Sequence, residues 1–296
     1  MKRTTPVLKD DLTCQEYLDQ QKLIVDEHLD QCLPPLHTPP EVIHEAMRYS
    51  VFPGGKRIRP ILALSTGEAL GGHFQQLIAL AGALEMIHTY SLIHDDLPAM
   101  DDDDYRRGQP STHKKFGEAI ALLAGNGLLI RAFQLLAELP AQAGEMETKV
   151  AVLDQICRAT GTTQGMLAGQ VLDLEKQDTP FSAQQLEQIH SAKTGALIQA
   201  SVRCAALLSG ASEEIYKSLS AFGQKIGLAF QIVDDILDCS QDSGKSPATY
   251  PATYGLEESR EIAIELVEKA IQDIESLGSR GETLTELARF ISVQRF

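Results

Sequence analysis

Apolar residues recur at intervals of three and four through almost the whole chain. The clearest stripe starts at Leu77, continues through Leu80, Leu84 and Ile87, and reaches Asp95. This spacing places the side chains on one face of a helix, whereas a strand shows alternation with a period of two. Alternating patterns of useful length are absent from the sequence. The pattern therefore predicts an all-α fold.

Turn-forming residues divide this pattern into separate helices. Glycine or proline pairs stand at 34–35 and 71–72, and Ser182 with Gln185 has the spacing of a capping box that begins a helix. No linker or repeat separates two halves, so residues 1–296 are expected to form one helical domain. Helices are expected at about 11–33, 40–51, 57–70, 77–95, 116–138, 148–175, 182–209, 212–239, 256–277 and 284–293.

Composition and charge exclude several classes of protein. The chain has 41 acidic and 26 basic residues, a formal net charge of −15. This excess argues against nucleic-acid binding, which needs a basic surface. The five cysteines form no CxxC pair and are expected to be reduced thiols. Because the chain has neither an apolar signal core nor an unbroken run of about 18 apolar residues, a cytoplasmic protein without a membrane span is expected.

Two aspartate clusters each follow an apolar helical segment. The first places six aspartates within residues 95–104, and the second consists of Asp234, Asp235 and Asp238. Carboxylates this close repel one another unless a cation lies among them, and oxygen ligands without histidine or cysteine suit Mg²⁺. A single acidic run usually means a solvated surface. Two clusters at helix C-termini, where the macrodipole disfavours acids, instead favour a metal site.

A basic turn stands where a diphosphate could bind. Lys56, Arg57 and Arg59 follow Gly54-Gly55 at a predicted helix start. Freed backbone amides, a helix N-terminus and arginine side chains together favour an anion with several oxygens. Basic turns are common, so this signal is modest by itself.

Two further arginines, Arg106 and Arg107, directly follow the first aspartate cluster. This position allows them to hold phosphate oxygens beside a metal ion. For one of the two, the alternative is a structural salt bridge to the aspartates at 102–104.

Five motifs occur in order: Gly54 to Pro60, Glu85 to Gly108, Gly169 to Asp173, Lys193 to Gly195, and Gly227 to Asp238. Together they resemble the trans-prenyl diphosphate synthase family over most of the chain. One such match could be coincidence, whereas five in sequence are not. The resemblance implies a bundle of antiparallel helices around a central substrate cavity, usually in a homodimer.

The resemblance also implies roles for individual residues. One set would surround three Mg²⁺ ions that hold an allylic diphosphate: Asp95, Asp96, Asp101, Asp234, Asp235 and Asp238. A second set would contact that diphosphate: Arg106, Lys193 and Lys245. A third, introduced by Gly55, would bind isopentenyl diphosphate: Lys56, Arg59, His88 and Arg107. The catalytic residues would be Asp95, Asp101, Asp234 and Lys193, with Thr194 and Gln231 near the allylic carbon.

Prenyl transfer explains why such residues are needed. An allylic C–O bond ionises only when metals and cations stabilise the departing diphosphate. The carbocation must be shielded from water and faced by neutral dipoles, here the Thr194 hydroxyl and the Gln231 carbonyl. The isopentenyl double bond then attacks, and the released diphosphate takes the proton. For His88, which shares a helix face with Ser91 and Asp95, a core histidine is the alternative to a substrate contact.

Tyr90 is the residue expected to set product length. It precedes Asp95 by five residues, which places it roughly 7–8 Å deeper along the helix. With Ser91 beside it, the ring would form the floor of the chain pocket. The insertion Pro98-Ala99 in the first motif also resembles bacterial farnesyl and geranylgeranyl enzymes. Farnesyl diphosphate is the expected product, and geranylgeranyl diphosphate, with Tyr90 merely packed against a helix, is the alternative.

Two positions depart from the family pattern. The segment after Asp238 is shorter than usual and offers only Lys245, and Asn126 stands where aspartate is more common. Other classes of protein fit the same residues less well. A class I terpene cyclase would carry a different second metal motif and no isopentenyl-binding turn. A non-catalytic helical partner subunit is expected to have lost one of the two aspartate clusters, and both are intact here. A plain acidic helical scaffold would need neither aspartate cluster.

Overall fold

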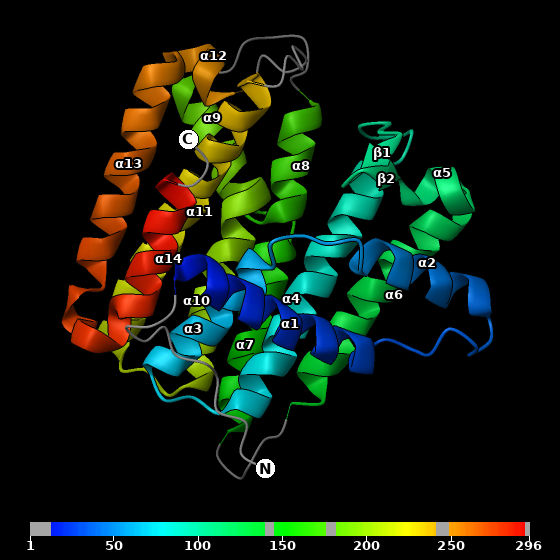
Figure 1. Cartoon of the computed structure of the whole chain (residues 1–296), viewed down its shortest axis with the longest axis horizontal. Coiled ribbons are helices and arrows are strands. Elements are labelled where there is room, and N and C mark those ends of the chain that lie inside the picture. Colours follow the sequence, from blue (N-terminus) through cyan, green and yellow to red (C-terminus); the bar gives the residue numbers. More distant parts are fainter. Residues whose placement is uncertain (1–12, 140–144, 176–181, 241–248, 294–296) are drawn as a thin grey trace.

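Helices make up nearly all of the structure (Figure 1). The computed structural model describes residues 13–139, 145–175, 182–240 and 249–293. Within these ranges the only strands are β1 (Tyr105–Arg106) and β2 (Gln109–Pro110), a short antiparallel pair that follows the first aspartate cluster. The prediction of an all-α fold is confirmed.

The helices pack side by side around a central cavity, with α4 running through the middle of the molecule (Figure 1). The predicted capping box is confirmed, because the Ser182 hydroxyl accepts a hydrogen bond from the Gln185 amide. In chain order the helices are α1 (Cys14–Cys32), α2 (Glu41–Val51), α3 (Ile58–Ala69), α4 (Phe74–Asp95), α5 (Thr112–Phe116), α6 (Glu118–Ala137), α7 (Met146–Thr160), α8 (Met166–Leu174), α9 (Ala183–His190), the π-helix η1 (Ser191–Gly195), α10 (Ala196–Leu208), α11 (Glu213–Ser240), α12 (Tyr250–Tyr254), α13 (Leu256–Asp273), the 3₁₀-helix η2 (Glu275–Gly281) and α14 (Glu282–Val293).

Glycine breaks one helix that the apolar period predicts as continuous. Segment 148–175 forms two helices, α7 and α8, which are separated by residues 161–165. A Cβ atom on Gly165 would lie 2.3 Å from the carbonyl oxygen of Arg158, so only glycine fits this turn. Residues 161–165 read Gly-Thr-Thr-Gln-Gly and carry no large apolar side chain, so a turn signal does stand between the apolar stripes of α7 and α8. The prediction of one continuous helix overlooked this signal.

Helix α4 is the central core helix. Leu80, Leu84 and Ile87 are fully buried, and the helix packs against α3, α6 and α10. In the described part of the chain, α4 and α6 are long and apolar enough to cross a membrane by length and composition. The apolar window of α4 is 72% buried inside the protein and that of α6 is 39% buried. The prediction of no membrane span considered only unbroken apolar runs, which polar residues interrupt in both helices.

Close helix packing fixes the position of η1. A Cβ atom on Gly169 of α8 would lie 2.3 Å from the backbone nitrogen of Lys193. One on Gly227 of α11 would lie 2.8 Å from the Cα of Gly195. Side chains at these two positions would push α8 and α11 away from η1. The glycines thus allow Lys193 and Thr194 to reach the cavity, and π-helical turns of this kind are frequent at functional sites.

Candidate active site

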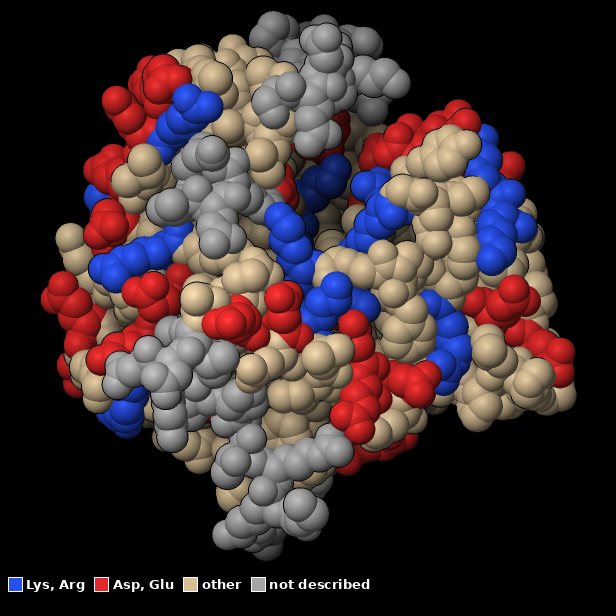
Figure 2. Space-filling model, in the orientation of Figure 1, with Lys and Arg blue, Asp and Glu red and all other residues tan. Residues whose placement is uncertain are grey.

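A cavity of about 1050 Å³ lies between α1, α3, α4, α8, η1 and α11. Figure 2 shows a hollow in this region, with lysine and arginine along much of its edge and acidic residues at its upper edge. Most of the predicted site residues line the cavity: Gly55, Lys56, Arg59, His88, Tyr90, Ser91, Asp95, Arg107, Lys193, Thr194, Gln231 and Asp234. The remaining ones that the structure describes lie around it: Asp96, Asp101, Arg106, Asp235 and Asp238. Lys245 lies outside the described residues.

Helix α4 ends at the first aspartate cluster. Its last residue, Asp95, faces the cavity, and the chain folds back so that the Asp101 amide donates a 2.8 Å hydrogen bond to the Asp95 carbonyl. Burial raises the pKa of Asp95 to about 6. Lys193 opposes this shift, while the neighbouring carboxylates of Asp101 and Asp96 add to it. A divalent cation would relieve this repulsion, so the donor set fits Mg²⁺.

Asp96 points away from the cavity toward Arg106. The carboxylate is buried and accepts a 2.9 Å hydrogen bond from Arg106 Nε. Arg106 also lies 3.1 Å from Asp103, one of the aspartates named in the salt-bridge alternative. In this structure Arg106 therefore braces the loop that carries Asp101, and its predicted diphosphate contact stays a prediction.

The opposite side of the cavity carries a group of cations. Arg107 donates a 2.6 Å hydrogen bond to the carbonyl of Gly54. A Cβ atom on Gly55 would lie 2.8 Å from the Arg107 guanidinium, so glycine lets this side chain reach across the turn. Arg59 is buried, and its Nε has no hydrogen-bond partner among the described residues. Burial lowers the pKa of Arg59 to about 10, with Glu85 opposing and Arg107 adding to the shift. Such crowding of like charges favours a bound anion.

His88 lies beside these arginines in the cavity wall. Burial, followed by the charges of Arg59 and Arg107, lowers the pKa of His88 well below its usual range. The ring is therefore neutral at pH 7 and has one N–H donor to offer a substrate oxygen. The cavity position supports the predicted substrate contact over a core histidine.

Arg57 differs from its neighbours in the basic turn. The residue is 2% exposed, and its guanidinium forms ion pairs with Asp26 at 2.8 Å and Glu85 at 2.5 Å. It also donates a 2.7 Å hydrogen bond to the Val51 carbonyl. The sequence grouped Arg57 with the substrate-facing cations, but these contacts show a structural role in holding the turn between α2 and α3 against α1 and α4. Glu85, inside the first motif, carried no separate signal.

The three aspartates of the second cluster, on α11, lie in different surroundings. Asp234 lines the cavity and Asp238 is exposed. Asp235 is buried and accepts hydrogen bonds from Gln231 Nε2 at 3.0 Å and from the Tyr250 amide at 2.9 Å. The carbonyl of Gln231 in turn accepts a 2.6 Å hydrogen bond from the Thr194 hydroxyl. Thr194 and Gln231 are thus brought together, as the prediction requires.

Lys193 reaches the cavity from η1 and pairs with a third acidic residue. Its Nζ lies 2.7 Å from Asp173 of α8. The positive charge faces Asp95 and Asp101 as well, and these carboxylates together raise the pKa of Lys193 although burial opposes them. Asp173 closes the Gly169–Asp173 motif, which gave a position in the sequence but no function.

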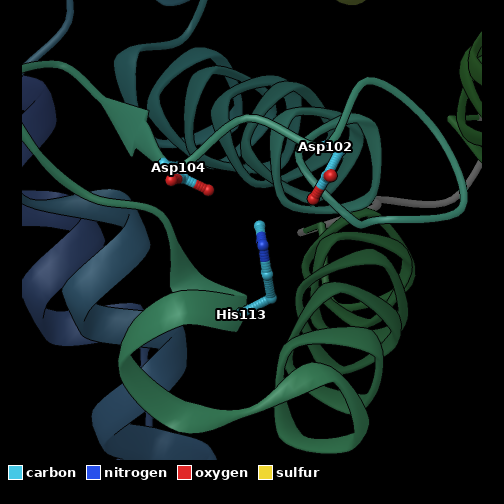
Figure 3. Close-up of side chains that lie close together, drawn as sticks. All are labelled: Asp102, Asp104 and His113. Atoms are coloured by element: carbon cyan, nitrogen blue, oxygen red, sulfur yellow. The ribbon is translucent and has the colours of Figure 1, made fainter.

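A separate group of possible ligands, Asp102, Asp104 and His113, lies outside the cavity lining (Figure 3). One candidate ligand atom of each lies within 4.8 Å of the others. Protein groups already engage two members, because Lys114 pairs with Asp104 at 2.6 Å and the Ser111 hydroxyl lies 3.0 Å from His113 Nδ1. This group is therefore separate from the aspartates at the cavity.

Tyr90 lies in the cavity wall below the aspartates. Its side chain is 4% exposed and meets the His94 ring edge-on, with 5.5 Å between ring centroids. Ser91 also lines the cavity and donates a 2.9 Å hydrogen bond to the His88 carbonyl. The ring thus both packs against its own helix and borders the cavity, which supports the floor interpretation.

The comparisons with known proteins agree with this site. A family model described as Polyprenyl synthetase matches residues 40–276. The chain belongs to the polyprenyl synthetase family. It is 40% identical over 294 residues to farnesyl diphosphate synthase of Geobacillus stearothermophilus, covering 96% of this chain and 98% of that protein. It is 43% identical over 293 residues to geranylgeranyl diphosphate synthase of Cyanophora paradoxa, covering 93% and 94%.

A solved structure shows the same fold. The apo form of a FPP/GFPP synthase from Zymomonas mobilis has a TM-score of 0.87 and 35% sequence identity, covering 95% of this chain and 99% of that one. The predicted family is confirmed, and family and relatives together support trans-prenyl diphosphate synthase activity. Relatives named for farnesyl and for geranylgeranyl products match at similar identity, so sequence similarity is compatible with both product lengths.

Proposed function

We propose that this polyprenyl synthetase is a Mg²⁺-dependent enzyme that condenses dimethylallyl or geranyl diphosphate with isopentenyl diphosphate to give farnesyl diphosphate. One observation carries the proposal: a single cavity has carboxylates on one side, a cluster of cations on another, and Tyr90 in the wall beneath them. Two diphosphates of different kinds, with one growing chain between them, fit this division.

The allylic diphosphate belongs at the carboxylate side. Asp95, Asp101 and Asp234 would hold the Mg²⁺ ions, three when substrate is bound, because hard oxygen donors suit this cation. When bound, the ions neutralise charge on the departing diphosphate. Lys193 supplies a positive charge at the same place without needing a metal, since its pairing with Asp173 keeps it protonated.

Isopentenyl diphosphate belongs at the cation side. Lys56, Arg59 and Arg107 would bind its oxygens, and the buried Arg59 side chain loses little conformational entropy on binding. The neutral His88 ring would donate one hydrogen bond. The allylic carbocation would lie against Thr194 and Gln231, whose oxygens offer partial negative charge without a nucleophile of high basicity.

Removal of the metal tests this proposal. With geranyl and isopentenyl diphosphates, condensation is expected to fall to background in excess EDTA and to return when Mg²⁺ is restored, because ionisation needs a stabilised leaving group. The product is dephosphorylated, and the released prenyl alcohols are separated by chain length. Turnover that persists at the same rate in EDTA would contradict the metal requirement, and no turnover under any condition would favour the non-catalytic partner subunit.

We also propose that the chain, as one catalytic domain of residues 1–296, works as a cytoplasmic homodimer. Helix α6 exposes Leu122, Leu123 and Ile130 by 46%, 50% and 60%, which is unusual for large apolar side chains on one helix. Leu122 also lines the cavity, so the cavity extends toward this face. A second copy covering α6 would remove these side chains from water.

Light scattering tests the dimer. The mass is expected to be twice 32.3 kDa for the natural chain and near 32.3 kDa for Leu123→Arg combined with Ile130→Arg, because charges would be buried in the interface. Leu23→Arg is the matched control, since this α1 leucine is 70% exposed and should leave the mass unchanged. A dimer that survives both arginines on α6 would place the interface elsewhere.

A further inference from the structure

The two adjacent aspartates of the second cluster differ in their surroundings. Asp234 lines the cavity, whereas Asp235 is 5% exposed and lies among protein groups. Each carboxylate oxygen of Asp235 has its own donor: Oδ1 accepts from Gln231 Nε2 at 3.0 Å and Oδ2 accepts from the Tyr250 amide at 2.9 Å. His190 Nε2 lies 3.7 Å from the same Oδ2, and its ring stacks on Tyr250. These contacts leave Asp235 poorly placed for direct metal ligation.

The hydrogen bond that Asp235 accepts from Gln231 determines which way the Gln231 amide faces. A carboxylate only accepts hydrogen bonds, so the Gln231 amino group must point toward Asp235. The Gln231 carbonyl oxygen then points toward Thr194, whose hydroxyl donates to it at 2.6 Å. Because the Thr194 proton is used in this bond, the lone pairs of its oxygen remain available on the cavity side. Gln231 and Thr194 therefore present oxygen atoms, rather than N–H or O–H groups, to the cavity.

We propose that Asp235 is a positioning residue that fixes the Gln231 amide and the Thr194 hydroxyl so that their negative ends face the allylic carbocation. This inference rests on the proposed prenyl transfer and changes the role of Asp235 from metal ligand to dipole orientation. If the amide turned over, its N–H groups would face Thr194 and the cation, and the dipole would oppose ionisation. Oriented dipoles of this kind stabilise developing charge without rearranging during the reaction.

The variant Asp235→Asn is the test substitution. Asparagine has the same shape, but an NH₂ group replaces one of the two oxygens, so either Gln231 or the Tyr250 amide would face a donor instead of an acceptor. The Gln231 amide is then free to turn. The kcat is expected to fall about 10- to 100-fold, as for other residues that orient a catalytic group, while the Mg²⁺ concentration for half-maximal rate changes less than about twofold. For Asp234→Asn the half-saturating Mg²⁺ concentration is expected to rise.

A double-mutant cycle with Gln231→Ala separates the two roles of Asp235. If Asp235 acts through Gln231, adding Asp235→Asn to Gln231→Ala causes no further loss of kcat. If Asp235 binds a metal, the two losses multiply, and the inference is overturned. All rates are compared per folded protein, with melting curves for each variant, so that a loss of stability is not counted as a loss of catalysis.

Binding of inorganic pyrophosphate with Mg²⁺ gives a readout that does not depend on turnover. The rise in Tm that pyrophosphate and Mg²⁺ produce together is expected to be retained in Asp235→Asn and lost in Asp234→Asn. Loss of the Tm rise in Asp235→Asn would overturn the inference. If the natural enzyme showed this Tm rise but condensed no prenyl substrate, the proposed function would fail, whereas the pyrophosphate result would still decide whether Asp235 is a metal ligand.

Discussion

Replacing Asp95 by asparagine is expected to reduce kcat by about 1,000-fold or more, the largest effect predicted for any single change in this enzyme. Asp95 ends α4 at the cavity and lies beside Lys193 and the other aspartates. Asparagine keeps the size of the side chain but removes the charge that would attract Mg²⁺. The measurement is single-turnover conversion of geranyl diphosphate at saturating Mg²⁺.

The matched control for this prediction is Asp102→Asn. Asp102 belongs to the same acidic run but is exposed and lies outside the cavity lining. Its replacement should change kcat less than about twofold, as for most surface substitutions. Similar losses in the two variants would mean that the total charge of the loop matters, rather than the position of Asp95.

The second large effect concerns product length. Tyr90→Ala is expected to shift the main product from fifteen to twenty or more carbons, because removing the ring opens the wall of the cavity below the aspartates. Truncating such a buried aromatic side chain costs about 3–5 kcal/mol of stability, so melting curves must show that the variant is folded at the assay temperature. Products are dephosphorylated and sized by chromatography.

Tyr90→Phe is the control for the ring itself. Phenylalanine keeps the bulk that would stop the chain and should keep the fifteen-carbon product. A longer product from Tyr90→Phe would assign chain length to the hydroxyl group. An unchanged product distribution from Tyr90→Ala would show that Tyr90 only packs against its neighbours and that another part of the cavity wall limits the chain.

The order of the helices was predictable because the apolar period runs along single helices. The same reasoning placed Asp95 and Asp234 at helix ends, which the structure brings to one cavity. The break at 161–165 was missed because the apolar stripes on either side suggested one helix, although the segment Gly-Thr-Thr-Gln-Gly is a polar, glycine-rich turn. Local spacing reports the face of a helix but not how closely two backbones approach.

Roles that depend on partners from other helices were harder to predict. Arg57 resembles Lys56 and Arg59 in sequence. Its ion pairs with Asp26 and Glu85, which come from two other helices, give it a structural role instead. Asp235 adjoins Asp234 but faces Gln231 and Tyr250 across α11 and α12. In both cases only tertiary contacts distinguish the roles of neighbouring residues of the same chemical type.

Prenyl transfer and its fifteen-carbon product are tested together by the size of the product made from dimethylallyl and isopentenyl diphosphates with Mg²⁺. The alcohols released by phosphatase are separated by chain length. If the enzyme makes farnesyl diphosphate with Mg²⁺, the main alcohol is farnesol, and no condensed product forms after EDTA treatment. If the main alcohol is geranylgeraniol, prenyl transfer stands, but Tyr90 does not limit the chain to fifteen carbons. The absence of any condensed product would contradict prenyl transfer by this enzyme.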